Sequence, residues 1–440
     1  MKHLFMVLNR LVICLFMFLL GENLSFGQQF RAAVGKVNIT PVDSQHLLGY
    51  GARKSTAVHD SIYHRIVVMD DGTQKFILVS SDICLVSPSE YDKVAKKIEE
   101  KYNVPNNNFW WSTTHTHSAP ELGPPGLAEA FLGERYTHQY DTNYTAITES
   151  KLYKAVEEAI SKLEPARLAV GWGESNANIN RRARDIHGNT NLGLNPDIPV
   201  DRKIGIIRLE KADHSIMAII ANYAMHGTVI GGECTLISGD GPGVVSDFVE
   251  SKTGATMLFI NGAAGNVAPI YSTQPNAFRL KEFEALLGEK IIDANSKING
   301  SISQIKMKTG DTIVKTARKD GLKWPGYLSN YTGKDQKGND IVKLPIRFLN
   351  LNNDIAIWAA PLELFNEVAV EIRNKSPFEY TFFYGYTNGW LGYMLTDNEI
   401  PYGGYEPTVS PFKVGAQNDL IKSVIDYLKE SKRKITGKQN

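Results

Sequence analysis

The sequence predicts a mixed α/β fold in which central β-sheets are flanked by helices. Apolar runs of strand length alternate with amphipathic, helix-length segments through most of the 440 residues. The composition is 42% hydrophobic and 22% charged, which is ordinary for a globular protein and argues against disorder. No internal repeat, low-complexity segment or linker is visible. We therefore expect residues 28–440 to form one domain.

The first two thirds of the chain predict a hairpin, a helix and a series of buried strands. Residues 66–69 and 76–80 are expected to pair across an Asp70-Asp71-Gly72 turn. The segment 89–101 predicts a helix that Ser87 or Ser89 can cap. The other elements expected here are strands at 109–112, 168–172, 204–209, 216–222 and 256–261 and helices at 149–163, 244–252 and 278–294.

The last third predicts strands followed by a helix, a strand and a helix. These elements are a strand-rich region at 305–359, helices at 363–373 and 418–430, and a strand at 380–384. Two earlier stretches, 121–143 and 185–200, are rich in glycine, proline or asparagine and are the least structured by pattern. Both flank segments with candidate site residues. They are therefore expected to shape access to a site, although surface insertions have the same composition.

Residues 1–27 have the features of a cleaved signal peptide. Lys2 and Arg10 precede an apolar run at 11–20 that is too short to span a bilayer comfortably. No later stretch is long and apolar enough to be transmembrane, so we expect a periplasmic or secreted protein. The formal net charge of +1, without a long basic run, gives no sign of a nucleic-acid surface. The oligomeric state stays open.

The three cysteines do not form a metal-binding pattern. Cys14 lies in the predicted signal peptide. Cys84 lies in an apolar run, which predicts a small buried side chain, and Cys234 lies in a glycine-rich loop. A Cys84–Cys234 disulfide is compatible with an oxidising compartment, but the sequence does not establish it.

Residues 113–120, Thr-Thr-His-Thr-His-Ser-Ala-Pro, form the most informative motif in the chain. They follow the aromatic strand expected at 109–112, and side chains two positions apart in extended backbone point to the same side. His115 and His117 can therefore face one site, and histidine is the commonest metal ligand in proteins. For the motif alone, a polar loop with two solvated histidines is the simpler explanation.

Three further segments place chemically competent side chains in suitable loops. His226 directly follows an expected strand, and Glu363 directly follows the apolar run 355–360. Tyr393 and Tyr405 lie in a loop rich in glycine and tyrosine. Each residue also has a purely structural explanation. His226 would form hydrogen bonds, Glu363 would be a carboxylate favoured at a helix N-terminus, and the two tyrosines would pack against neighbouring side chains. Taken singly, none of these residues establishes a site.

Motifs spread along the chain resemble those of one enzyme family in content and order. The two most specific are Thr-His-Thr-His-Ser-Ala-Pro at 114–120 and Asn-Gly-Ala-Ala-Gly-Asn-Val-Ala-Pro at 261–269. Weaker matches are 33–41, 49–51, 81–83, 86–87, 180–181, 224–226, 238–240 and 242–243. This order is similar to that in the catalytic domain of the neutral, non-lysosomal ceramidases, zinc-dependent amidases that cleave the N-acyl bond of ceramide.

Position by position, the resemblance implies a zinc site and a set of catalytic groups. The implied Zn²⁺ ligands are His115, His226, Glu363 and Tyr393. The implied polar groups around the scissile amide are His117, Arg181 and Tyr405. Tyrosine is an uncommon zinc ligand, and the adjacent Arg182 leaves the arginine assignment open by one position. The implied reaction is attack of a zinc-activated water on the amide carbonyl of a small-molecule or lipid substrate.

The chain departs from the ceramidase pattern within 261–269. Where those enzymes carry a serine proposed as a catalytic group, this chain has Ala268, and Asn266 replaces an aspartate. A mechanism that needs the serine hydroxyl is therefore excluded, whereas a metal–water mechanism is not. The C-terminal β-sandwich of the longer ceramidases is also expected to be absent.

Several other functions stay open beside ceramide hydrolysis. One is hydrolysis of a different amide or ester, for example a glycan-linked one, and another is a non-catalytic binding protein. A barrel-type amidohydrolase also places His-x-His after a strand. It requires an eightfold βα repeat, which is not visible.

Overall fold

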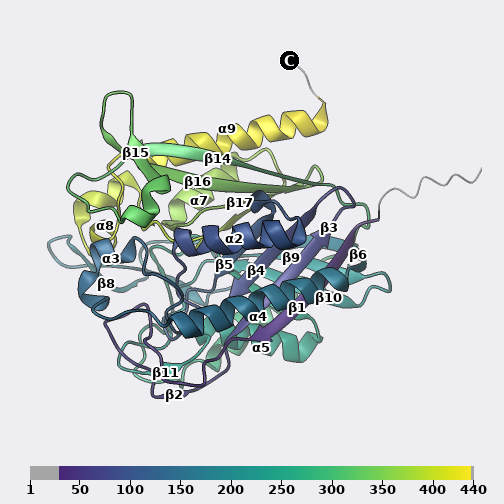
Figure 1. Cartoon of the computed structure of the whole chain (residues 1–440), viewed down its shortest axis with the longest axis horizontal. Coiled ribbons are helices and arrows are strands. Elements are labelled where there is room, and N and C mark those ends of the chain that lie inside the picture. The colour runs from purple at the N-terminus through teal and green to yellow at the C-terminus, as the bar shows by residue number, and fades with distance from the viewer. Residues whose placement is uncertain (1–28, 438–440) are drawn as a thin grey trace, which may run out of the picture.

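The computed structural model describes residues 29–437 and has the mixed α/β architecture that the sequence predicts. The signal peptide predicted at 1–27 lies outside these residues. Within 29–437, no helix has the length and apolar character needed to cross a membrane. Three portions of β-sheet enclose a central core, and helices cover the outer face of each portion (Figure 1).

The largest sheet has eight strands in the order β12-β10-β9-β6-β1-β3-β4-β5. Its strands are β1 (Arg31–Asn38), β3 (Tyr63–Asp70), β4 (Lys75–Ser81), β5 (Phe109–Thr113), β6 (Glu164–Glu174), β9 (Lys203–Lys211), β10 (Ile216–Tyr223) and β12 (Thr256–Asn261). β1 and β6 pair through two residue pairs only, Arg31 with Pro165 and Ala32 with Glu164. This short junction lets the two halves of the sheet turn toward each other.

The fold of this sheet brings its two edges together. The Ser80 hydroxyl on β4 donates to the Phe259 carbonyl on β12 at 2.6 Å. Asn261, at the end of β12, donates to the Thr114 carbonyl just beyond β5 at 3.3 Å. Loops that follow strands at opposite ends of the strand order therefore meet in space.

A second sheet forms the third side of the core. It contains β14 (Met307–Ala317), β15 (Thr332–Lys334), β16 (Asp340–Leu351), β17 (Ile355–Ala359) and β19 (Tyr380–Tyr384). Alternate residues of each strand face the central core, as the period of two in a strand requires. On β3, Val67 faces this core and Ile66 faces the helices outside, and Ile357 of β17 reaches the same core from the second sheet.

Two helices cover each sheet portion. The pairs are α2 (Pro88–Tyr102) with α4 (Thr142–Ser161), α5 (Asp240–Thr253) with α6 (Glu289–Ser296), and α7 (Asn366–Lys375) with α9 (Ala416–Thr436). In Figure 1, α9 lies along β14 and β16, while α2 and α4 lie in front of β4, β3 and β1. Leu420, Val424 and Leu428 recur every four residues on the buried face of α9. Ser87 caps α2, as predicted.

Shorter elements shape the loops. The short strands are β2 (Ala57–Val58), β7 (Asn178–Arg184), β8 (Thr190–Asn195), β11 (Leu236–Ile237), β13 (Val267–Pro269), β18 (Glu363–Leu364) and β20 (Tyr393–Met394). The short helices are α3 (Ala128–Phe131), α8 (Tyr405–Thr408), η1 (Asn106–Asn108), η2 (Gly133–Arg135), η3 (Glu284–Gly288), η4 (Gly326–Tyr331) and η5 (Asp397–Tyr402). Cys84 and Cys234 are both buried and free, so the disulfide that the sequence left open is not formed here.

Some predicted elements have different bounds or a different type. Glu363 lies in β18 rather than at the start of a helix, because its N–H donates to the Gly392 carbonyl at 3.1 Å; α7 begins at Asn366. The helix expected at 149–163 begins earlier, because Asp141 caps its N-terminus.

Two further differences arise from turns and polar strands. The helix expected at 278–294 is replaced at its start by turns, followed by the π-helical η3 and then α6. Leu280 and Phe283 are both buried, and a turn of three residues satisfies that apolar spacing as well as a helix does. The stretch 185–200 contains β8, a strand that pairs with β7. Its polar sequence gave no strand signal.

Candidate metal centre

The candidate centre forms where strands of all three sheet portions end. The loops after β5 and β10 supply His115 and His226, and the short strand β18, which follows β17, supplies Glu363. An isolated bridge between Thr116 and Gly227 joins the two histidine loops. A Cβ atom at Gly227 would lie 2.7 Å from the His115 carbonyl oxygen, so this close approach requires glycine. The fold therefore brings together side chains that are far apart in the sequence.

The three side chains converge on one carboxylate oxygen. His226 Nε2 lies 3.0 Å and His115 Nε2 lies 3.3 Å from Glu363 Oε2. All three groups are buried, and their ligand atoms lie within 4.8 Å of one another. Trp390 Nε1 donates to Glu363 Oε1 at 2.9 Å, and the Tyr386 hydroxyl donates to Oε2 at 3.3 Å. These donors fix the orientation of the carboxylate.

The outer nitrogen of each histidine faces a backbone carbonyl. His115 Nδ1 lies 3.0 Å from the Cys84 oxygen, and His226 Nδ1 lies 2.7 Å from the Ala264 oxygen. A proton on Nδ1 satisfies each carbonyl, so Nε2, on the Glu363 side of each ring, is the atom that can coordinate a cation. Two imidazole nitrogens and one carboxylate oxygen form a donor set that fits a divalent ion such as Zn²⁺.

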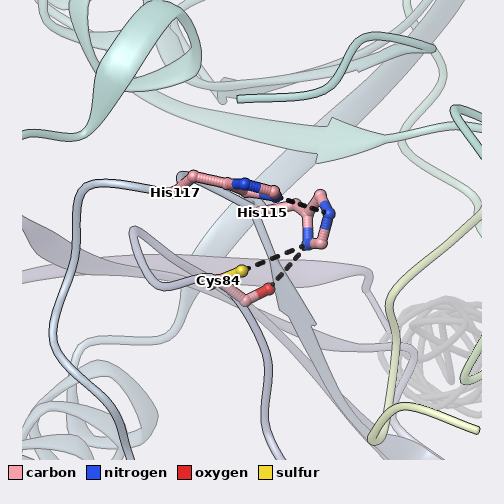
Figure 2. Close-up of side chains that lie close together, drawn as sticks. All are labelled: Cys84, His115 and His117. Atoms are coloured by element: carbon pink, nitrogen blue, oxygen red, sulfur yellow. Dashed lines mark hydrogen bonds between the residues drawn. The ribbon is translucent and has the colours of Figure 1, made fainter. Parts of the chain in front are cut away.

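His117 stands beside this cluster. Its Nε2 lies 3.2 Å from Nε2 of His115, and the two rings meet edge to face (Figure 2). Figure 2 also places Cys84 on the Nδ1 side of the His115 ring, with Sγ 3.7 Å away. Cys84, His115 and His117 form a second group of atoms close enough to share an ion. However, His117 Nδ1 has no hydrogen-bond partner, so no carbonyl orients its ring for coordination.

Arg181 reaches the centre, whereas Arg182 points away from it. Arg181 Nη1 lies 2.8 Å from His226 Nε2, and Nη2 donates to the Tyr393 hydroxyl at 3.1 Å. Arg182 instead donates to Glu399 at 2.7 Å. Successive residues of β7 face opposite sides of the strand, which explains the difference. The geometry therefore favours Arg181 over its neighbour.

Tyr393 and Tyr405 lie on the Arg181 side of the centre. Tyr393 on β20 pairs directly with Glu363 on β18, and the two tyrosine rings are 5.9 Å apart. Burial, aided by the Glu363 charge, raises the pKa of Tyr393 well above its usual range and also raises the pKa of Tyr405. Glu406 is fully buried and accepts from Arg181 Nε at 3.0 Å, so it balances that charge.

The charges within the cluster depend on one another. Burial disfavours a charged His115, but the Glu363 carboxylate outweighs it and raises the pKa of His115 to about 10. Burial and the Arg181 charge lower the pKa of His226 to about 3. Burial and the two neighbouring histidines lower the pKa of His117 well below its usual value. Without a metal, one proton on His115 therefore balances Glu363, and a bound cation would replace that proton.

A cavity of about 330 Å³ opens onto the centre. Its wall contains six large apolar side chains, Leu48, Leu85, Leu132, Leu192, Leu194 and Trp390. Its polar part contains His115, His117, Arg181, Glu363, Tyr393 and Tyr405, and Ala268 also lines it. The cavity is bordered by both 121–143 and the β7–β8 hairpin, the stretches that were expected to shape access.

The sequence did not single out Trp390, Tyr386 or Glu406, although each holds a site residue in place. Tyr386 and Asn388, with φ angles of 52° and 65°, adopt backbone that non-glycine residues rarely use. Such geometry is visible only in a structure. In the sequence, only the glycine- and tyrosine-rich composition around these residues indicated that the loop contributes to a site. It did not indicate which side chains contact the site residues.

Comparison with known proteins assigns the chain to a family. The family model described as neutral/alkaline non-lysosomal ceramidase, N-terminal, matches residues 30–275, and the chain belongs to this family. Among curated relatives, the neutral ceramidase of Pseudomonas aeruginosa is 25% identical over 261 residues, which cover 56% of this chain and 38% of that protein. Neutral ceramidase A of Dictyostelium discoideum is 28% identical over 234 residues, which cover 51% of this chain and 32% of that protein. The chain thus matches well under half of these relatives' length.

Solved structures share the fold over most of the chain. The crystal structure of neutral ceramidase from Pseudomonas aeruginosa matches with a TM-score of 0.74 and 19% identity, and the match covers 93% of this chain and 75% of that chain. A structure of a ceramidase complexed with C2 gives a TM-score of 0.75 at 19% identity, with 93% and 76% covered. The second half of the chain, which carries Glu363, Tyr393 and Tyr405, is therefore included in a shared fold.

Proposed function

We propose that the chain is a zinc-dependent amidohydrolase that cleaves an N-acyl amide bond, with a ceramide-like lipid as the favoured substrate class. The observation that carries this proposal is the convergence of His115 and His226 on Glu363, with each Nδ1 held by a backbone carbonyl. His115, His226 and Glu363 would hold Zn²⁺, with the Tyr393 hydroxyl as the fourth ligand. The names of the two relatives described above, both neutral ceramidases, support the substrate class.

The reaction adds water across the amide. When bound, Zn²⁺ supplies a Lewis acid that lowers the pKa of water and polarises a carbonyl. His117 lines the cavity with its Nε2 3.2 Å from that of His115, so its imidazole can accept a proton of the attacking water and deliver it to the leaving nitrogen as the C–N bond breaks. Arg181 and Tyr405 line the cavity and can donate hydrogen bonds to the carbonyl oxygen as its negative charge develops.

A second candidate rests on Ala268. This residue lines the cavity where the ceramidases proper carry a serine, so it supplies no hydroxyl to a substrate. An altered family member would act on a different amide or an ester, including a glycan-linked one, or would bind a ligand without turnover. Export to the periplasm or the exterior is proposed from residues 1–27, and N-terminal sequencing of the mature protein tests it.

Metal analysis combined with turnover tests the proposed reaction. The purified protein should contain about one zinc per chain and hydrolyse a fluorescent N-acyl sphingosine or a simpler N-acyl amine. Chelation should abolish turnover, and added Zn²⁺ should restore it. Full activity of metal-free protein would refute the zinc mechanism. Stoichiometric zinc without hydrolysis of amides or esters would favour the binding protein.

A further inference from the structure

Arg135 is a cavity-lining cation without a strong partner. It ends η2 within the stretch 121–143 and lies beside the apolar wall at Leu132. Its Nη1 lies 3.4 Å from the Gly49 carbonyl, which is long for a hydrogen bond. Its Nε lies 3.7 Å from Glu134, whose side chain is 73% exposed, and an exposed pair of this length contributes little. The guanidinium therefore keeps most of its capacity to bind an anion.

The other arginines on this side of the centre already have carboxylate partners. Arg181 and Arg182 share the two oxygens of Glu406. Arg182 and Arg184 also pair with Glu399 at 2.7 Å. Among the described residues that line the cavity, Glu363 is the one carboxylate, and the histidines face it. No acidic side chain of the wall is thus left to neutralise Arg135.

A second guanidinium lies close behind the same wall. Arg53 packs against the Tyr50 ring, with its central carbon 4.8 Å from the ring centre, and Tyr50 lines the cavity. Arg53 Nε and Nη1 are buried without hydrogen-bond partners. Burial lowers the pKa of Arg53, and the positive charge of Arg135 adds to that effect. Arg135 thus lines the cavity while Arg53 lies behind Tyr50, and an anion bound at Arg135 would relieve the repulsion between the two charges.

We propose, resting on the amidohydrolase function above, that the natural substrate is a long-chain N-acyl amide that differs from ceramide itself, which is neutral, in carrying an anionic group, and that Arg135 determines this specificity. A guanidinium presents paired N–H donors that match a carboxylate in geometry and charge. The apolar wall around Leu132, Leu192 and Leu194 accommodates an acyl or alkyl chain beside it. The anion takes no part in bond breaking; hydrolysis releases a carboxylic acid and an amine as before.

Three substrates with the same chain length separate the contributions. N-Dodecanoylglycine carries a carboxylate on the amine side, the succinic monoamide of dodecylamine carries one on the acyl side, and N-dodecanoylethanolamine is the neutral match. The wild-type enzyme should prefer one of the two anionic amides over the neutral one by about tenfold or more in kcat/KM. The preferred anionic amide identifies the side of the scissile bond that faces Arg135.

Substitution of Arg135 then tests the contact itself. Arg135→Gln should reduce kcat/KM for the preferred anionic amide by about 10- to 100-fold, mainly through KM, and change the neutral amide by less than about threefold. Arg135 also lies near Tyr405, where its charge opposes the rise that burial causes in the pKa of Tyr405. Any effect that Arg135 exerts through Tyr405 acts on both substrates and cancels in their ratio. Arg135→Lys should retain part of the preference. Arg433→Gln, at an exposed position on α9, removes the same charge elsewhere and should change neither substrate.

Ionic strength gives an independent measurement. Added salt should raise KM for the anionic amide in the wild type but not in Arg135→Gln. Equal kcat/KM for anionic and neutral amides, unaltered by Arg135→Gln, would overturn the specificity proposal while leaving the amidohydrolase intact. Zinc-loaded protein that cleaves none of the three amides, nor N-acyl sphingosine, would instead count against the proposed function.

Discussion

The cavity has a floor, formed by His115, His226, Glu363 and Tyr393, and a mouth, formed by residues such as Arg135 and Leu192. These two regions are built in different ways. On the floor, each proposed ligand is held by a second contact: a carbonyl for His115 and for His226, an indole N–H for Glu363, and an Arg181 N–H for Tyr393. At the mouth, Leu192 is 57% exposed and Arg135 has only long or solvent-exposed partners. The floor is therefore preorganised, whereas the mouth has unused contacts for a substrate.

Because of this difference, we expect the floor to carry out the reaction and the mouth to select the substrate. The floor side chains follow strand ends and are fixed by buried hydrogen bonds, so a change there should alter metal binding or turnover. The mouth belongs to the stretch 121–143 and the β7–β8 hairpin, so a change there should alter the choice of substrate. Substitutions in the two regions should consequently produce separable effects on kcat and KM.

Loss of a floor ligand should have the largest effect. His115→Ala removes one of the two nitrogens directed at Glu363. Zinc content should fall close to zero, and kcat/KM should drop by at least about 10³-fold, measured by elemental analysis and amide hydrolysis. His187→Ala removes an exposed imidazole from the β7–β8 turn and should change neither quantity. Retained zinc and activity in His115→Ala would place the metal elsewhere.

Loss of a hydrogen-bond donor that does not hold the metal should come next. Tyr405→Phe keeps the ring against Tyr393 but removes the hydroxyl. We expect kcat to fall by about 10²-fold with KM and zinc content nearly unchanged, because the hydroxyl acts on the charge that develops during the reaction. Tyr402→Phe, on a half-exposed ring in the same loop, is the matched control. A loss of zinc in Tyr405→Phe would instead make this tyrosine a ligand.

The sequence predicted the strands of the floor but not the contacts that orient it. Buried strands such as β12 are almost wholly apolar, so pattern alone located them, and His226 and Glu363 were recognised because they follow such runs. The convergence of these side chains depends on the bend of the large sheet, which no local pattern encodes. The partner carbonyls of Cys84 and Ala264 carry no sequence signal, since every residue has a carbonyl.

The mouth was less predictable for a different reason. β8 has the sequence Thr-Asn-Leu-Gly-Leu-Asn, in which glycine and asparagine weaken the strand signal. It forms a strand because β7 offers it a hydrogen-bonding edge, and β7 in turn is fixed by its pairing with β13. Tertiary context therefore overrides local propensity at the mouth. The alternation of Leu192 and Leu194 toward the cavity could be seen only after that pairing was known.

A change in the support of the floor should have a smaller effect than loss of a ligand. Trp390→Phe keeps an aromatic ring but removes the N–H that donates to Glu363 Oε1 at 2.9 Å. Zinc affinity should decrease by about 10- to 100-fold, measured by competition with a chelator, because an oriented carboxylate binds metal more tightly. Trp324→Phe loses a similar bond, to the Leu328 carbonyl at 2.7 Å, and should leave zinc affinity unchanged. Equal affinities in the two variants would mean that the indole N–H does not support the ligand.

The smallest effect is expected at the mouth, from loss of apolar contact alone. Leu192→Ala removes part of the exposed wall and should raise KM for a long-chain amide by about three- to tenfold. The kcat for that amide, and both constants for a short-chain one, should stay the same because no floor contact changes. Ile186→Ala is a matched control, since Ile186 is 96% exposed on the same hairpin and does not line the cavity. If Leu192→Ala lowered kcat for both amides alike, the mouth would influence the chemistry, and the separation between recognition and catalysis would fail.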